Sequence, residues 1–480
     1  MLFPIAREDE RTLQSQIREE LERAVASGRF TPGDPAPSTR KLSKALGVSR
    51  NTVSIAFQAL VDQGVLEARE RSGYYIARVE TNRPAVPKGD SQIDWSDRLT
   101  ARPSGFEPVP RPDDWRQAPY PFIYGQFDPT LFPISEWRDA TRKAMGRRWL
   151  EDWTEDRYVD DDPMLIDQIR RRLLPRRGVA ADEDEILITL GGQNAIYLVA
   201  ELLIPWNAPA VIEEPGYPDA RAIMGARTRN LRPQPVDDQG MIVDERLEGA
   251  RLIYTTPSHH YPSNVTMSLE RRTALLAAAE KYDSVILEDD YEPEASAVSA
   301  PRPALRSLDR AGRVVYTGSL SKSIMPGLRL GYMVGAPEFI REARALRRML
   351  LRHPPGVNQR VAALFMAARH HDMLLGRIRR AMAARREAAI TALRTYAPDW
   401  RISPTEGGGG LWLRCPEELD TRTLAVEAMK DGVMIEPGYV CFAASPPPQN
   451  YFRLGLSVIS ADKVEEGIRR LAAAAERVQT

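Results

Sequence analysis

The spacing of hydrophobic residues changes twice along the chain and predicts three segments. Near the N-terminus, Leu13, Ile17, Leu21 and Val25 recur every four residues, which predicts one face of an amphipathic helix that ends near Gly28. Further on the periodicity weakens, and short continuous apolar runs then replace it. We therefore expect a head, a linker and a large second domain, with boundaries at residues 1–78, 79–120 and 121–480.

The head contains three predicted helices followed by two short strands. Ser38 is placed to cap a helix that Gly47 ends, and Ser49 is placed to cap the next helix, which stops at Gly64. The runs VLEAR and YYIA follow, joined by the turn ERSG. Three helices and a β-hairpin in this order are typical of a mostly α winged helix-turn-helix domain.

The linker and the second domain differ in proline content and in apolar pattern. Seven of the 42 residues from 79 to 120 are proline, against 38 in all 480, so we expect an extended connector. Five apolar runs then predict strands buried on both faces of a parallel sheet, at residues 185–192, 209–217, 251–258, 284–291 and 313–322. Helical patterns lie between them, and a smaller α+β lobe ends the chain. This predicts an α/β domain with its chemistry at the carboxyl ends of the strands.

Composition and charge narrow the class of protein. Lys plus Arg and Asp plus Glu each total 66, so the zero net charge argues against a uniformly basic coat but allows a small basic face. The two cysteines, Cys415 and Cys441, are too few for a disulfide framework. We find neither a signal-peptide pattern nor an apolar stretch of ~18 residues, so we expect a cytoplasmic protein without a membrane span.

The head carries such a basic face. Between residues 36 and 61 there are four cations (Arg40, Lys41, Lys44 and Arg50) and no acid, which suits contacts to DNA phosphates. The third helix begins with Ser49, Arg50, Asn51 and Thr52, and recognition helices read base edges from their N-terminal residues. The candidate DNA-binding residues are Arg40, Ser49, Arg50, Asn51 and Thr52. Arg69 and Arg71 flank the wing. A protein-interaction module with solvated charges is the alternative.

The segment SGRFTPGDPAPSTRKLSKALGVSRNTVSIAFQALVDQGVLEARERSGYYI resembles the winged-helix domain of GntR-type bacterial transcription regulators, over about residues 11–77. The resemblance implies binding to a double-stranded DNA operator. Pro35 stands where members of that family usually carry a basic residue, which puts one usual DNA contact in question.

A second set of residues suggests a cofactor. Lys322, just past a buried strand, can form a Schiff base with pyridoxal phosphate, and Ser319, Ser321 and Arg329 are of the kind that hold a phosphate. The turn Gly191–Asn194 can present backbone amides at a helix N-terminus. Asp289 can pair with a protonated pyridine nitrogen, because a carboxylate in an apolar setting needs a partner.

Three further side chains complete this set. Tyr291 can donate to the phenolic oxygen of the cofactor, Tyr217 can stack on its ring, and Arg453 can hold a substrate carboxylate. Each candidate alone also has a plainer explanation: a surface ion pair for Lys322 or Arg453, a solvated turn around Asp289, and ordinary packing for Tyr217.

In this order the sites resemble those of fold type I aminotransferases, and the whole chain resembles the MocR subgroup of GntR regulators, over about residues 11–77 and 121–475. The resemblance implies a multidomain protein that binds pyridoxal 5'-phosphate, with Lys322 as the Schiff-base lysine and Arg453 as the effector-binding arginine. It also implies a homodimer, because Tyr158 matches a tyrosine that reaches the neighbouring subunit's cofactor. The implied cofactor-binding residues are Lys322, Asp289, Tyr291, Tyr217, Gly192, Gln193, Ser319, Ser321, Arg329 and Tyr158.

Two motifs depart from the family pattern. The usual PSHQ-x-P-x-G turn reads PSHHYPSN, with His260 for glutamine and Asn264 for glycine, and YVDDDP replaces a common YGDPxG. These changes alter either the fit of the amine or the loop geometry. Adjacent histidines such as His259 and His260 do not converge on one ion without further ligands, so we expect no metal site.

Together the segments suggest three functions. In the first, a dimeric transcription regulator senses an amino compound that displaces Lys322 to form an external aldimine, while Arg453 holds an acidic group. In the second, the protein is a working aminotransferase with an accessory DNA domain. In the third, the aminotransferase-like domain serves only for dimerisation, which the intact lysine, aspartate and tyrosines disfavour. Aminosulfonates, ω-amino acids and diamino acids all remain compatible effectors.

Overall fold

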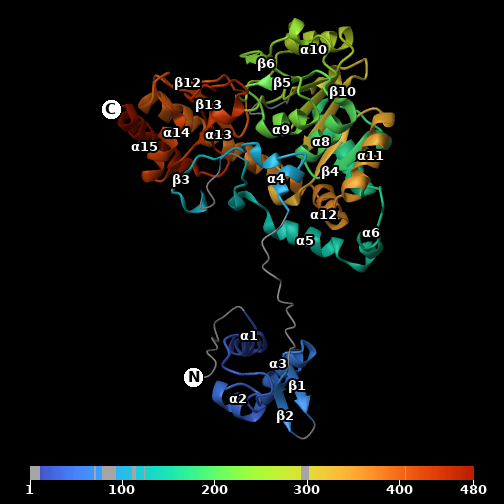
Figure 1. The fold of residues 1–480 in the computed structure, drawn as a ribbon, viewed down its shortest axis with the longest axis vertical. Helices are drawn as coiled ribbons and strands as arrows, with labels where there is room; N and C mark the ends of the chain where they lie inside the picture. Colours follow the sequence, from blue (N-terminus) through green and yellow to red (C-terminus); the bar gives the residue numbers. More distant parts are fainter. Residues whose placement is uncertain are drawn as a thin grey trace. The chain divides into compact units, whose positions relative to one another are not determined.

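The computed structural model describes residues 11–69, 72–77, 93–110, 115–123, 125–292, 302–405 and 407–479. The chain forms two compact units, Met1–Ala101 and Arg102–Thr480, which carry the blue and the cyan-to-red parts of the ribbon in Figure 1. Each unit is described by itself below.

The first unit contains the predicted winged helix-turn-helix. Its elements are α1 (Leu13–Ala26), α2 (Thr39–Leu46), α3 (Arg50–Asp62), β1 (Leu66–Arg69), β2 (Gly73–Ile76) and α4 (Trp95–Arg98). Both predicted caps are confirmed: the Ser38 hydroxyl accepts from the Lys41 amide at 3.2 Å, and the Ser49 hydroxyl accepts from the Thr52 amide at 3.0 Å. Gly47 ends α2 in the left-handed conformation at φ 65°. Arg71 lies outside the described residues.

A single apolar core holds the first unit together. Ile17 and Leu21 of the predicted amphipathic face are fully buried against Val53, Phe57 and Leu60 of α3. The wing pairs β1 with β2 in antiparallel register, with Leu66 opposite Ile76. The apolar face of α3 is buried in this core, and the polar residues at the start of the helix therefore lie on the surface.

The second unit is built on an eight-stranded sheet with the order β4-β11-β10-β9-β8-β5-β6-β7. Its strands are β4 (Ile186–Thr189), β5 (Ala210–Glu214), β6 (Leu231–Asp237), β7 (Gly240–Met241), β8 (Leu252–Thr255), β9 (Val285–Asp290), β10 (Val314–Ser319) and β11 (Gly331–Val334). The five predicted strands are confirmed as β4, β5, β8, β9 and β10. The sheet is mixed, because β11 runs antiparallel to both β4 and β10. The five strands nevertheless share one direction, so their carboxyl ends meet at one edge.

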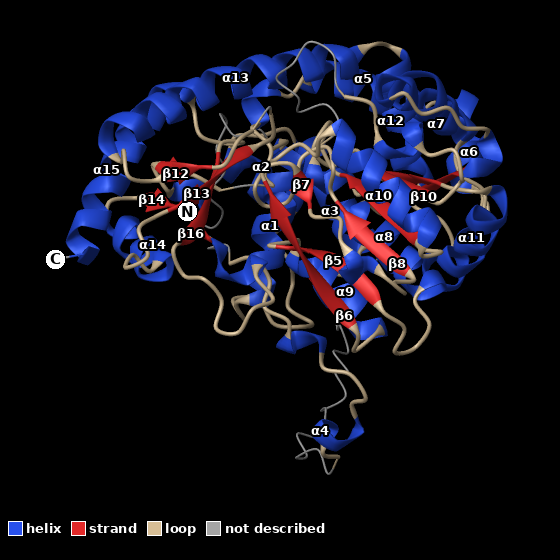
Figure 2. Cartoon of the chain, turned by 90° about the horizontal axis from the view of Figure 1, so that it is seen from above, coloured by secondary structure: helices blue, strands red, loops and turns tan. Residues whose placement is uncertain are grey.

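Helices enclose this sheet, as Figure 2 shows in blue around the red strands. They are α5 (Ile134–Ala144), α6 (Leu150–Thr154), α7 (Pro163–Gln168), α8 (Gly192–Leu203), α9 (Pro218–Arg227), α10 (Leu269–Lys281), α11 (Pro337–Leu351) and α12 (Gly356–Ala367). Along β4, Ile186 and Ile188 belong to one apolar core and Leu187 to another. The strand is therefore buried on both faces, as its continuous apolar run predicts.

Short helical turns connect these elements. They are η1 (Pro103–Gly105), η2 (Trp115–Gln117), η3 (Pro129–Leu131), η4 (Arg147–Trp149), η5 (Ile169–Leu173), η6 (Leu174–Arg177), η7 (Glu183–Glu185), η8 (Glu245–Leu247), η9 (Leu305–Leu308), η10 (Pro326–Leu328) and η11 (Gly438–Cys441).

The predicted small α+β lobe has its own sheet, β12-β13-β16-β15, which is antiparallel throughout. Its elements are β12 (Arg401–Ile402), β13 (Gly410–Arg414), β14 (Val433–Met434), β15 (Glu436–Pro437), β16 (Tyr451–Gly455), α14 (Thr421–Lys430) and α15 (Ala461–Gln479). The long helix α13 (His370–Tyr396) contacts both α12 and α15 and so joins the two lobes. A short strand from earlier in the chain, β3 (Tyr120–Pro121), pairs with β14. Residues 125–128 therefore cross from the small lobe towards α5.

Candidate functional site

The carboxyl ends of the strands surround a cavity of about 270 Å³, called here the main cavity. Lys322, just past β10, lies in its wall together with Asp289 of β9. The lining residues are Gly125, Gln126, Gly192, Gln193, Ile196, Tyr217, Tyr254, Tyr261, Asp289, Tyr291, Ser319, Ser321, Lys322, Pro326 and Arg329. Nine of the ten cofactor-binding residues predicted from the sequence are among them; the tenth is Tyr158.

Asp289 is a buried carboxylate whose two oxygens accept from neutral hydroxyls. The Tyr254 hydroxyl donates to Oδ2 at 2.8 Å, and the Thr317 hydroxyl donates to Oδ1 at 3.3 Å. Burial is the largest influence on this group and raises its pKa to about 6, although the Tyr254 hydrogen bond lowers it. A cation in the main cavity would stabilise the ionised form, so Asp289 is suited to a protonated ring nitrogen.

Another part of the main cavity is suited to an anion. Helix α8 begins at Gly192, and its N-terminus carries backbone amides and a partial positive charge. A Cβ at Gly191 would lie 3.4 Å from the Arg329 guanidinium, so the turn and this cation are in close contact. The Ser319 hydroxyl accepts from the Ser321 amide at 3.2 Å, and both serines are buried. Together these groups form the kind of arrangement that binds phosphate.

Three tyrosines form an aromatic wall at the side of the main cavity. The rings of Tyr217 and Tyr261 meet edge to face with centroids 5.2 Å apart, and those of Tyr261 and Tyr291 are 6.4 Å apart. The Tyr217 hydroxyl donates to Asp219 at 2.9 Å, which fixes the ring. Edge-to-face contacts and this hydrogen bond hold the wall as a single packed unit.

Two predicted site residues do not line the main cavity. Arg453 is buried behind the aromatic wall, with its guanidinium carbon 4.7 Å from the centre of the Tyr261 ring. Tyr158 is 58% exposed and has φ 62°, and its ring lies 5.0 Å from the guanidinium carbon of Arg352. The first lies one side chain away from the main cavity, and the second faces solvent in the isolated chain.

The two departures in PSHHYPSN are both buried. His260 contacts the Ser263 hydroxyl at 2.6 Å and the Pro215 carbonyl at 3.0 Å, and burial lowers its pKa to about 3, so the ring stays neutral at physiological pH. Asn264 adopts φ 59°, a conformation in which asparagine is tolerated, and its side-chain amide donates to the Gly410 carbonyl at 2.6 Å. Asn264 therefore ties this loop to β13 of the small lobe. Among the described residues, no group of three or more His, Cys, Asp or Glu side chains is arranged to hold a metal ion.

Sequence reasoning missed Tyr254 and Tyr261 as site residues. Tyr254 lies within a continuous apolar run, so the sequence alone suggests an ordinary residue of the hydrophobic core. Its function depends on register: Tyr254 is opposite Leu287, and Asp289 is two residues further along the same face of β9. A register for β8 and β9 would have predicted the Tyr254 to Asp289 contact, but a single sequence does not supply one.

In the first unit, Ser49, Arg50, Asn51 and Thr52 lie at the start of α3, and Arg40 lies at the start of α2. Arg40, Ser49, Arg50 and Asn51 are exposed and Thr52 is half-buried. The Ser49 and Thr52 hydroxyls share a hydrogen bond of 2.7 Å, so both also help to begin the helix. Pro35 forms an isolated bridge with Tyr75 of the wing. Its neighbours make the hydrogen bonds, from the Ile76 amide to the Asp34 carbonyl and from the Ala36 amide to the Tyr74 carbonyl, so residue 35 needs no amide proton.

The fold and the site define a winged helix-turn-helix joined to an aminotransferase-like domain. Residues 13–76 match the family model for bacterial regulatory proteins of the gntR family, and residues 126–471 match aminotransferase class I and II. The chain belongs to the MocR subgroup of GntR-type regulators, in which these two domains are fused. Membership of the aminotransferase family implies pyridoxal phosphate as the cofactor.

Relatives and solved structures agree with this assignment. The chain is 42% identical over 467 residues to the HTH-type transcriptional regulator TauR of Rhodobacter capsulatus, covering 96% of each. It is 30% identical over 466 residues to the probable rhizopine catabolism regulatory protein MocR of Rhizobium meliloti, covering 96% of this chain and 93% of that protein. Kynurenine aminotransferase of Pyrococcus horikoshii superimposes with a TM-score of 0.72 at 26% identity, over 80% of this chain and 98% of its own. No helix in the described part of the chain has the length and apolar character needed to cross a membrane.

Proposed function

We propose that this protein is a pyridoxal-phosphate-dependent transcription regulator that binds DNA through its winged helix and senses a small amino compound at Lys322. The observation that carries the proposal is that Lys322, Asp289 and the anion-binding start of α8 line one cavity in a chain that also has a GntR-type head. One domain would bind DNA, and the other would bind the cofactor and the effector.

The residues of the main cavity fit the cofactor. Asp289 would hold the ring nitrogen, the start of α8 with Ser319, Ser321 and Arg329 would hold the phosphate, and Tyr217 would pack against the ring. When bound, pyridoxal phosphate supplies an aldehyde that condenses reversibly with primary amines. Lys322 would hold the cofactor through this aldehyde, and an amino compound that binds in the main cavity would take the place of the lysine.

The contact between Arg453 and Tyr261 links the aromatic wall to effector binding. The Arg453 guanidinium carbon lies 4.7 Å from the centre of the Tyr261 ring, and Tyr261 lines the main cavity. An acidic group of the effector that pairs with Arg453 would alter this contact and, through it, the aromatic wall. Binding of such an effector therefore shifts the aromatic wall. An effector can regulate the protein only if it binds one conformation more tightly than another, and a shifted wall is such a second conformation.

Residues 107–109, in the C-terminal part of the predicted linker, contact the aromatic wall and the small lobe, so a shift of the wall would move them. Val109 packs against the apolar cluster that contains Tyr261, and the Tyr439 hydroxyl donates to the Glu107 carboxylate. Tyr439 belongs to η11 of the small lobe. A movement of the wall or of the small lobe thus reaches residues 107–109, which lead back to the DNA-binding head.

We also propose that the protein acts as a homodimer. Tyr158 lies beside the end of α11, where Met349 is 76% exposed and Leu350 is 48% exposed. Exposed apolar side chains in the last turn of α11, which precedes Arg352, favour a subunit interface in this region. In that interface, Tyr158 would contribute to the cofactor site of the partner subunit.

The experiment that tests the function is a comparison of visible absorption spectra. The full-length protein loaded with pyridoxal phosphate is expected to show a band from the lysine-linked cofactor, which Lys322→Ala abolishes and the surface control Lys281→Ala retains. A wild-type protein without this band would contradict the proposal.

The same protein then distinguishes a regulator from an aminotransferase. An amine that gives a stoichiometric spectral change and alters operator affinity supports regulation. Sustained turnover of amine and α-keto acid without an effect on DNA binding would instead favour a working aminotransferase, since Lys322, Asp289 and seven other predicted cofactor-binding residues line the main cavity.

A further inference from the structure

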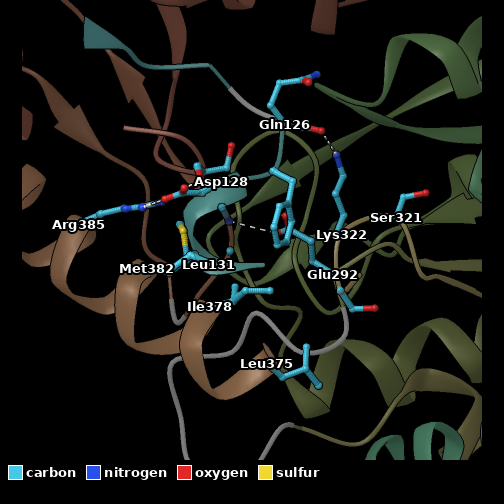
Figure 3. A pocket seen from close by; sticks show the side chains of 16 residues that line it. Gln126, Asp128, Leu131, Glu292, Ser321, Lys322, Leu375, Ile378, Met382 and Arg385 are labelled. Atoms are coloured by element: carbon cyan, nitrogen blue, oxygen red, sulfur yellow. Dashed lines mark hydrogen bonds and ion pairs between the residues drawn. The ribbon is translucent and has the colours of Figure 1, made fainter. Parts of the chain in front are cut away.

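A second, smaller cavity, called here the side cavity, also has Lys322 in its wall (Figure 3). It shares Gly125, Gln126, Ser321 and Lys322 with the main cavity. Lys322 Nζ donates to the Gly125 carbonyl at 3.2 Å, and a Cβ at Gly125 would lie only 3.0 Å from this nitrogen. The absence of a side chain at Gly125 therefore leaves the two cavities adjacent at the reacting nitrogen.

The far wall of the side cavity is aliphatic. Leu375, Ile378 and Met382 of α13 follow each other at spacings of three and four residues, so they share one helical face. Figure 3 shows these three side chains together with Leu131 of η3. Hydrocarbon packed against this wall is removed from water, which is favourable.

The charged residues of the side cavity do not provide a binding site for an acid. The Arg385 guanidinium donates to the Asp128 carboxylate and to the carbonyls of Leu456 and Ser457 at 3.2 Å and 2.8 Å, so its donors are already engaged. Glu292 adds a second carboxylate, which accepts from the Gly409 amide at 3.0 Å. Apart from Lys322, whose amine takes part in binding the cofactor, a negatively charged group placed here would meet two acids and a neutralised cation.

The lining of the side cavity also contains an uncharged polar group, the Ser323 hydroxyl. Ser323 is buried and lines the side cavity, and its hydroxyl makes no hydrogen bond among the described residues. A buried hydroxyl without a partner is costly, so an uncharged polar atom on a bound molecule would be accepted at this point.

The volume sets the size of the group that fits. The side cavity measures about 70 Å³. An apolar protein cavity of about 150 Å³ holds one benzene molecule, so half that space holds roughly two to four carbon atoms.

We propose that the side cavity binds a short, uncharged, mainly aliphatic segment of the amino effector while its amine reacts beside Lys322. This inference rests on the proposed function and specifies its ligand: an amino compound with two to four carbons directed towards α13, and any acidic group directed elsewhere.

The test uses the full-length, cofactor-loaded protein and the primary alkylamines from methylamine to pentylamine. Their affinities are read from the change in the lysine-linked absorption band and, independently, from the shift in melting temperature. In the wild type, affinity is expected to rise about fourfold per methylene up to three or four carbons and then to fall. Ile378→Phe, which fills the cavity, removes this rise and leaves methylamine binding unchanged. Ile378→Ala, which enlarges it, moves the optimum to a longer chain.

Ala383→Phe, on the exposed surface of the same helix, serves as the control and is expected to behave as the wild type. Affinities that are independent of chain length in the wild type, or the same length dependence in Ile378→Phe and the wild type, would overturn the subsite and leave the proposed function intact. No response to any amine, including methylamine, would overturn the proposed function and the subsite together.

Discussion

Asp289→Asn is expected to stabilise the cofactor-free protein while weakening its hold on the cofactor. Burial raises the pKa of Asp289 to about 6 from an ordinary value of 3.8. A carboxyl group with a raised folded-state pKa costs stability above that pKa, and the cost disappears as the pH falls below the unfolded value. Asparagine keeps an acceptor for the Tyr254 hydroxyl and removes the charge.

The expected size follows from the shift in pKa. At about 1.4 kcal/mol per unit, the shift amounts to roughly 3 kcal/mol at pH 8. At pH 5 the folded state is largely protonated, and roughly half of this difference remains. The stabilisation by Asp289→Asn should therefore be about twice as large at pH 8 as at pH 5.

Urea unfolding followed by tryptophan fluorescence measures this difference. All eight tryptophans occur at residue 95 or later, so the signal reports mainly on the second unit. Adding pyridoxal phosphate should raise the stability of the wild type more than that of Asp289→Asn, because only the wild type offers a charge to the ring nitrogen.

The neighbouring Asp290 provides a control of opposite sign. It accepts from the buried Arg177 guanidinium at 2.8 Å and from the Tyr316 hydroxyl at 2.8 Å. Asp290→Asn breaks this ion pair and should destabilise the cofactor-free protein by about 3–5 kcal/mol. If Asp289→Asn is also destabilising at pH 8, or if its effect is equal at both pH values, the reasoning about a buried charge is refuted.

Three further predictions concern other parts of the chain. Asn264→Gly removes the hydrogen bond to the Gly410 carbonyl and should lower the stability of the second unit by about 1–2 kcal/mol in the same urea unfolding assay. An unchanged urea midpoint would show that this bond contributes nothing to stability. Arg50→Ala should weaken operator binding by about 1–3 kcal/mol in fluorescence anisotropy, and equal affinity for operator DNA would exclude it from the DNA interface. Glu107→Gln should leave the spectral response to an amine intact but reduce the accompanying change in operator affinity, because it weakens the contact with Tyr439; full coupling in this variant would argue against a signal through residues 107–109.

Local signals in the sequence determined much of the architecture. Caps such as Ser38 and Ser49 act within one turn of helix, so their residue types and spacing predict where the helices of the head begin. The apolar runs that became β4, β5, β8, β9 and β10 are equally local, since burial on both faces requires a continuous apolar stretch. The clustering of Lys322 and Asp289 also followed from the sequence, because parallel strands present their carboxyl ends at one edge.

Tertiary structure alone decided which side chains touch within that cluster. Tyr254 became a partner of Asp289 through the register of β8 against β9. Arg453 of β16 lies against the Tyr261 ring because the small lobe packs on the loop after β8. The antiparallel β11 between β4 and β10 has the same apolar pattern as a parallel strand, so its direction was not readable from the sequence. The side cavity is the clearest case: it is formed by α13, η3 and the segment after β10, and the space between elements distant in sequence depends on how they pack.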